Sequence, residues 1–329
     1  MRKWKKRWSS LLLCAAMLVS LCVSAAAEED TVEETGPETE SVEYLDEDGA
    51  KQTYPSAVLV TDSDAKWENN WYVASGGVNI TGRVNVTGDV YLILKDGCNL
   101  TVDGGINVGK GNSLTIYGQT DGTGKLTATG GDYDAGIGGK EVNSSGTIII
   151  NGGEVTATSR DGAGIGGGQY GVGGTVTISG NADVTATGSA GIGGDTITIT
   201  DGEVTATGSS NGISGGSGGI SLTGGTVKAS SGRTGNGIAC GGTITISGST
   251  VIASGGWNGI SINGSIKVTA GEVTANGSDC LELCGRAKAD FQQSHEGLCS
   301  AEAGTERDEN PSAGESWHLL RGGTAQRRV

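Results

Sequence analysis

Hydrophobic and polar residues alternate in short segments that recur along most of the chain. One type of segment has a valine followed two positions later by an alanine, and it begins at Val155, Val184, Val204, Val227, Val251 and Val273. Successive side chains of a β-strand point to opposite faces, so the Val and Ala columns share one face and the intervening threonines share the other. The pattern therefore predicts repeated strands, each with one narrow apolar face.

Two further segments complete each repeat. One is a second alternating strand, such as "TVTIS" from Thr175 and "TITIS" from Thr243, and the other is a glycine-rich segment with a single isoleucine, such as "GAGIGGG" around Ile165. Three short extended pieces with a period of about 20 to 29 residues are typical of a parallel β-helix. We therefore predict an all-β, three-sided parallel β-helix (solenoid) of about nine coils.

The glycines have a physical explanation in this fold. Stacked coils lie about 4.8 Å apart, so equivalent residues sit directly above one another. At tight corners only glycine permits both positive φ angles and close backbone approach. The single isoleucine of each segment then fills the interior.

The composition changes along the chain and predicts five segments. Residues 1–27 resemble a secretory signal peptide, with a basic start, an apolar run and a terminal Ala-Ala-Ala. Residues 28–50 are acidic and are expected to form a disordered spacer. Residues 51–77 are expected to cap the first coil with Trp67 and Trp71, and residues 78–277 to form the β-helix. Residues 278–329 lose the repeat, and we expect an irregular tail that is disordered or read in a shifted frame.

Charge and hydropathy narrow the partners and the location. The net charge of −15 opposes nucleic-acid binding, which requires a basic surface. No second hydrophobic segment follows the signal-like run, so we expect no transmembrane segment in the mature chain and a secreted or loosely cell-surface-associated protein. The tail carries a Cys/His spacing that a metal could use, formed by Cys280, Cys284, His295 and Cys299.

Catalysis has one candidate arrangement. Glu154, Asp183 and Glu203 each precede the valine of a repeat and should stack into an acidic column, where a calcium ion would relieve their repulsion. Solvated turn acids are the simpler interpretation, because Thr226 and Thr250 occupy the same position later. No Arg, Lys or His recurs beside the column as a base. We therefore expect no catalytic residues, no metal ligands and no cofactor, with calcium as the one alternative.

Two surface patterns remain. Threonine pairs on four consecutive coils resemble the flat threonine faces of ice-binding β-helices, although threonine is favoured on any exposed strand. Three aromatic residues flank the glycine segments and are the candidates for exposed contact with a ligand: Tyr133, Tyr170 and Trp257.

The segments "WYVASGGVNITGRVNVTGDVYLILKDGCNLTV", "NSLTIYGQTDGTGKLTATGG" and "GAGIGGG…GGTVTISG…VTATG" resemble secreted, glycine-rich surface proteins of Gram-positive anaerobic bacteria. These are often described as carbohydrate-binding-domain or right-handed β-helix repeat proteins. The resemblance implies a right-handed coil and a role in adhesion or glycan binding, with an extracellular glycan or a host or cell-envelope surface as partner. A polysaccharide lyase or hydrolase is the alternative, and an ice-binding protein is less favoured.

Overall fold

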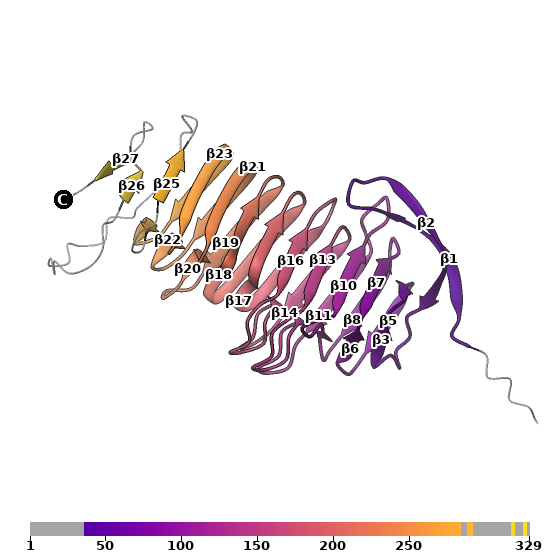
Figure 1. The fold of residues 1–329 in the computed structure, drawn as a ribbon. Helices are drawn as coiled ribbons and strands as arrows, with labels where there is room; N and C mark the ends of the chain where they lie inside the picture. Colours follow the sequence, from indigo (N-terminus) through magenta and orange to yellow (C-terminus); the bar gives the residue numbers. More distant parts are fainter. Residues whose placement is uncertain (1–35, 284–287, 292–316, 320–324, 328–329) are drawn as a thin grey trace, which may run out of the picture. The chain divides into compact units, whose positions relative to one another are not determined.

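The computed structural model describes residues 36–283, 288–291, 317–319 and 325–327. From Thr39 onward the chain forms one unit, in which it winds into stacked coils whose strands pair in parallel across successive coils (Figure 1). The predicted parallel β-helix, an all-β solenoid of about nine turns, is confirmed. Among the described residues no helix is long and apolar enough to cross a membrane.

The coils have three faces, each a ladder of parallel strands. Face A contains β4 (Trp71–Ala74), β7 (Asp89–Leu94), β10 (Ser113–Tyr117), β13 (Thr147–Ile150), β16 (Thr175–Ile178) and β25 (Lys288–Phe291). Face B contains β5 (Gly77–Ile80), β8 (Asn99–Val102), β11 (Lys125–Thr129), β14 (Glu154–Thr158) and β19 (Thr226–Ser231). Face C contains β3 (Lys66–Glu68), β6 (Val84–Thr87), β9 (Ile106–Asn107), β12 (Ile137–Gly138), β15 (Ile165–Gly166), β20 (Asn236–Cys240), β22 (Asn258–Ile262) and β24 (Asp279–Leu283).

Four longer strands turn corners and contribute to two or three faces: β17 (Asp183–Ile199), β18 (Glu203–Leu222), β21 (Thr243–Ser254) and β23 (Ser265–Asn276). Three strands do not belong to the faces: β1 (Thr39–Leu45), β26 (Trp317–Leu319) and β27 (Ala325–Arg327). The end of β2 (Lys51–Leu59) pairs in parallel with β4 and extends face A. β26 pairs antiparallel with β24 and with β27.

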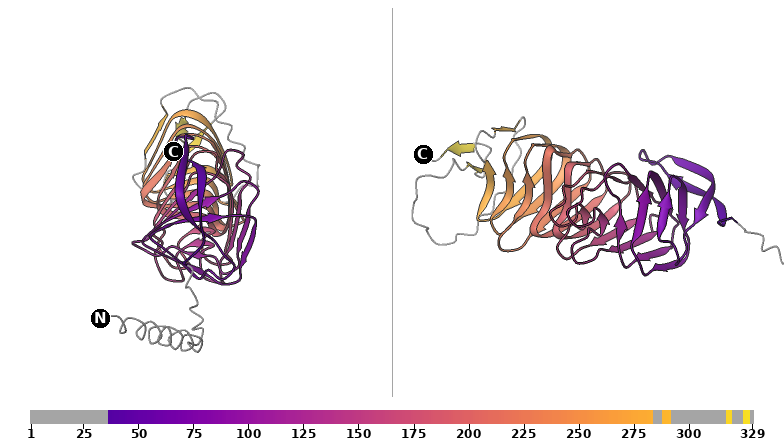
Figure 2. Two further views of the ribbon diagram at one scale, coloured as in Figure 1. Left: turned by 90° about the vertical axis from the view of Figure 1, so that its right-hand side faces the viewer. Right: turned by 60° about the horizontal axis from the view of Figure 1, so that its bottom comes forward.

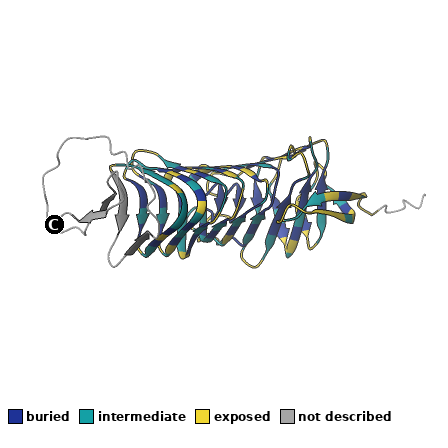
Figure 3. Ribbon diagram, turned by 90° about the horizontal axis from the view of Figure 1, so that it is seen from above, coloured by how far each residue is buried: buried dark blue, intermediate teal, exposed yellow. Residues whose placement is uncertain are grey.

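The predicted columns are in register. On face B, Val155 pairs with Val184 and Val184 with Val204, while the alanine column keeps the same register. These side chains are fully buried, and buried and more exposed positions alternate along the strands (Figure 3). The threonine pairs form the expected outward ladder on four coils, at Thr127, Thr129, Thr156, Thr158, Thr185, Thr187, Thr205 and Thr207.

The acidic segment differs from its prediction. Residues 28–35 lie outside the described residues, but β1 and β2 form an antiparallel hairpin where disorder was expected through residue 50. The strand arises because Val42 and Tyr44 alternate with polar residues and direct apolar side chains to one side. Asp46 stabilises the hairpin turn, since its Oδ1 accepts a hydrogen bond from the Ala50 amide at 2.8 Å. Figure 2 shows the hairpin in indigo at the start of the stack.

The hairpin covers an aromatic cluster on the outer side of face A. Trp71 stacks on Tyr91 and Tyr54 with ring centroids 4.5 and 4.6 Å apart, and it lies parallel to Tyr117 at 5.5 Å. Trp71 therefore packs beneath the hairpin and does not close the first coil, as its assignment to the cap had implied. Trp67 does lie in the interior, fully buried, and its Nε1 donates a hydrogen bond to Asp64 at 2.9 Å.

The boundaries of the stack also differ from those predicted. The coil strands begin with β3 and β4, before residue 78, because both pair in parallel with strands of the next coil. At the other end β24 and β25 continue the parallel ladders past residue 277. The predicted signal peptide and the residues Cys284, His295 and Cys299 lie outside the described residues.

Candidate functional site

The turns that connect face C to face A differ in length and create a step on the surface. Turn 139–146 follows β12 and turn 167–174 follows β15, whereas the equivalent connections inside β17 and β18 are only 194–195 and 216–218. The second long turn folds back across face C, because the Gln169 amide donates a hydrogen bond to the Tyr133 carbonyl at 2.7 Å. The next two coils lack such a cover, so face C is open there.

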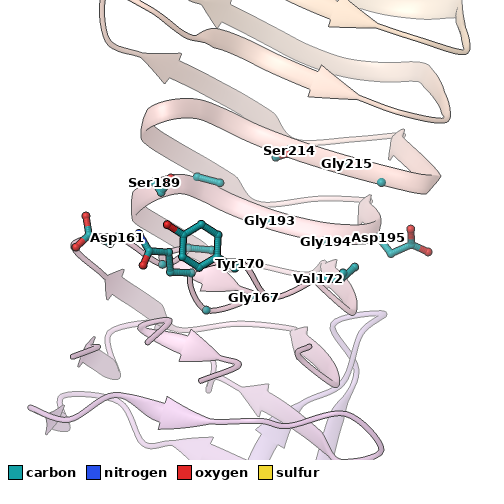
Figure 4. A pocket seen from close by; sticks show the side chains of 18 residues that line it. Asp161, Gly167, Tyr170, Val172, Ser189, Gly193, Gly194, Asp195, Ser214 and Gly215 are labelled. Atoms are coloured by element: carbon teal, nitrogen blue, oxygen red, sulfur yellow. The ribbon is translucent and has the colours of Figure 1, made fainter. Parts of the chain in front are cut away.

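A pocket of about 440 Å³ lies at this step, within the size range of small-molecule sites (Figure 4). We call it the step pocket. Tyr170 and Val172 of the long turn form its wall, and Gly193, Gly194 and Gly215 of the open coils form its floor. The remaining lining residues are Asp161, Gly162, Ala163, Gly167, Gly168, Gln169, Gly171, Gly173, Ser189, Ala190, Asp195, Ser214 and Gly216.

Tyr170 occupies an unfavourable backbone conformation. Its φ of 61° lies in the left-handed region, and its side chain is 82% exposed. Val142 holds the equivalent position one coil earlier, with φ of 54° and an exposure of 67%. Large side chains rarely adopt this conformation, and such strain gathers at functional sites. Tyr170 therefore combines backbone strain with a ring that has little packing of its own.

The floor of the step pocket is flat because its residues have almost no side chains. A Cβ built on Gly193 would meet the methyl groups of Ala163 and Ala190 at 3.4 and 3.6 Å, which is ordinary van der Waals contact. Glycine is thus not required at this position for stacking. Its absence of a side chain leaves room for a ligand to approach the backbone.

The structure does not bring the three predicted contact residues together. Tyr170 lines the step pocket, whereas Tyr133 is outside the lining and is joined to the wall through the backbone bond to Gln169. Trp257 precedes β22, which is four ladder steps from β15, or roughly 19 Å at 4.8 Å per step. The sequence reasoning missed the glycine floor and the flanking residues Asp161 and Asp195.

The acidic column forms as predicted, and lysines form ion pairs with both of its ends. Glu154, Asp183 and Glu203 are in register on face B. Lys125 Nζ lies 2.5 Å from Glu154 Oε2, and Lys228 Nζ lies 2.7 Å from Glu203 Oε1. No group of three metal-ligating side chains occurs in the part of the chain that the structure describes.

Asp183, at the centre of the column, gives a prediction about pH. Burial, followed by the negative charges of Glu203 and Glu154, raises the pKa of this carboxyl. A carboxyl whose pKa is higher in the folded than in the unfolded state lowers the free energy of unfolding when it is ionised. This destabilisation disappears as the pH falls through the folded-state pKa. Asp183→Asn should therefore raise the urea midpoint at pH 7, with a smaller gain as the pH approaches 4. Urea unfolding followed by circular dichroism at both pH values measures this, and an equal gain at both would contradict it.

A second pocket, of about 620 Å³, lies between the hairpin turn at residues 45–49 and the corners that precede face B at residues 180–183 and 201–203. Its lining is strongly acidic, with Asp46, Glu47, Asp48, Asp183, Asp201 and Glu203. This pocket has no signal in the sequence, because it depends on the position of the hairpin.

The comparisons with known proteins agree with this architecture. The model of the family described as "Beta helix repeat" matches residues 121–139, 148–169, 173–195 and 197–217. The chain is a β-solenoid, and its segment from 121 to 217 is similar to beta helix repeats. No curated protein and no solved structure gave a match. In this solenoid Val142 and the segment from Tyr170 to Val172 fall between matched repeats.

Proposed function

We propose that this solenoid is a non-enzymatic, secreted or cell-surface protein that binds a glycan in the step pocket, with Tyr170 as the platform for a sugar ring. The exposed ring of Tyr170, kept in a strained backbone beside a glycine floor, carries the proposal. An aromatic face is apolar and flat, and it complements the C–H bonds on one side of a pyranose ring. Ser189 and Ser214 bring hydroxyl groups to the same pocket.

The position of the strained turns supports a binding role. In solenoids, insertions between repeats map to loops on one face, which is often the binding face. Of the six exposed large apolar side chains among the described residues, four belong to the segments joined at this step: Tyr133, Val142, Tyr170 and Val172. Such gathering of exposed apolar groups favours a contact surface over chance exposure.

The sequence supports the proposed location and partner. The signal-like segment 1–27 supports export, and we propose an extracellular glycan, on a host or on the cell envelope, as the partner. The acidic charge makes a nucleic acid an unsuitable ligand.

Substitution of Tyr170 separates binding from stability. Tyr170→Gly removes the ring and relieves the positive φ, so the variant should fold at least as stably as the parent and lose about tenfold or more in glycan affinity. Tyr170→Phe should retain binding. Val142→Gly is the matched control, because it relieves the same turn conformation one coil earlier and removes no side chain that lines the step pocket. A glycan array, followed by titration calorimetry on the hits, provides the measurement.

Two results would contradict the proposal. Unchanged binding by Tyr170→Gly would exclude the step pocket as the site. Reducing ends or unsaturated products released from a bound glycan would instead support the alternative, a polysaccharide lyase or hydrolase.

A further inference from the structure

The charge of the step pocket restricts which glycans it can accept. Its lining contains two carboxylates, Asp161 and Asp195, and no lysine, arginine or histidine. Figure 4 shows these two side chains on opposite sides of the pocket. A ligand that lies across the glycine floor is therefore placed between two negative charges.

Neighbouring groups hold the Asp195 carboxylate in place, whereas Asp161 has only a long, exposed ion pair. Asp195 Oδ1 accepts hydrogen bonds from the backbone amide and the hydroxyl of Ser217, at 3.0 and 3.1 Å. Asp161 Oδ2 lies 3.8 Å from Arg160 Nε. The Arg160 guanidinium is largely exposed, and its Nη1 also lies 3.6 Å from Asp132 Oδ1. Arg160 is thus a shared, solvated cation outside the lining and offers a bound anion little compensation.

The geometry points to an uncharged sugar ring as the occupant of the step pocket, with rejection of uronic acids and other anionic glycans. The inference rests on the proposed function and adds the class of ligand. A carboxylate on the sugar would meet the same sign of charge on either side, and the lining offers no lysine, arginine or histidine to compensate for the hydration that it loses. An uncharged ring loses only the weaker hydration of its hydroxyl groups and can use the hydroxyls of Ser189 and Ser214.

Paired oligosaccharides that differ only in charge test this inference on the full chain. The probes are cellohexaose with its C6-oxidised form, and hexagalacturonate with its methyl ester. In each pair the uncharged member should bind about tenfold more tightly at low salt, and the difference should shrink near 1 M salt, where the Debye length is about 3 Å. Asp161→Asn combined with Asp195→Asn should narrow the ratio within each pair.

The outcomes distinguish this inference from the proposed function. Equal or tighter binding of the anionic members, with Tyr170→Gly still weakening it, would overturn the charge selection and leave glycan binding intact. A preference for uncharged members that the double variant does not narrow would also overturn it, because the two carboxylates would not be its cause. Absence of binding by all four probes and by the glycan array would overturn both.

Discussion

Gly166→Ala is expected to lower the free energy of unfolding by about 3–5 kcal/mol, whereas Gly193→Ala should change it by less than about 0.5 kcal/mol. The two glycines pair directly across adjacent coils. Gly166 has φ of 132°, and a Cβ there would overlap the Gly193 carbonyl oxygen. Gly193 lacks both constraints, because a Cβ at that position would meet only methyl groups at contact distance.

Urea unfolding followed by circular dichroism compares the two variants under one set of conditions. The pair forms a matched control, since the chemical change is the same and the positions are one coil apart. A similar loss of stability in both variants would mean that stacking requires glycine throughout face C. The bare floor of the pocket would then be a consequence of the fold and not a sign of ligand binding. Gly193→Ala should also reduce the depth of the step pocket.

Trp71→Ala is expected to cost about 3–5 kcal/mol of stability, the range for truncating a well-packed aromatic residue. Its ring contacts Tyr44, Tyr54, Tyr91 and Tyr117, which come from both the hairpin and face A. Removal of the indole should detach the hairpin from the sheet, because these rings form much of the contact between them. Thermal unfolding measures the loss, and limited proteolysis at turn 46–50 measures the release of the hairpin.

Trp257→Ala is the control for this experiment. Trp257 is 56% exposed, so its truncation should alter stability by no more than about 0.5 kcal/mol. A similar cost for both tryptophans, or protection of turn 46–50 in Trp71→Ala, would show that the aromatic cluster does not secure the hairpin.

The repeat could be predicted because stacking requires it in the sequence. Every coil contacts the next through equivalent positions, so the column from Val155 to Val273 appears as a period that needs no long-range information. The acidic column followed from the same register. In contrast, the lysines that pair with its ends, Lys125 and Lys228, do not recur and had no periodic signal.

The hairpin and the pocket could be inferred less well, for different reasons. Acidic residues dominate the composition around β1, so the alternation of Val42 and Tyr44 with polar residues was not recognised as a strand. The step pocket depends on how turn 167–174 folds back over its own face, which rests on single hydrogen bonds such as that from Gln169. One signal was available: the interval from Ile137 to Ile165 is longer than that from Ile192 to Ile213. This difference shows that the connections between strands become shorter along the chain, but it does not show on which face the longer turns lie.

The pairing of β2 with β4 also bears on aggregation. A bare first strand of a parallel stack would be a template for strands of other copies, and β2 occupies part of that edge through Val58 and Leu59. β1 follows β2 at this end, and its outer edge is covered in part, because the Leu45 amide donates a hydrogen bond to the Gly118 carbonyl at 3.0 Å and Gln119 Nε2 donates one to the Glu43 carbonyl at 2.7 Å. Two copies that met along β1 would bring Glu43 and the acidic turn after it together with their own counterparts, and repulsion between like charges would oppose the contact. The same acidic residues that suggested disorder thus act against fibril-like growth from this end.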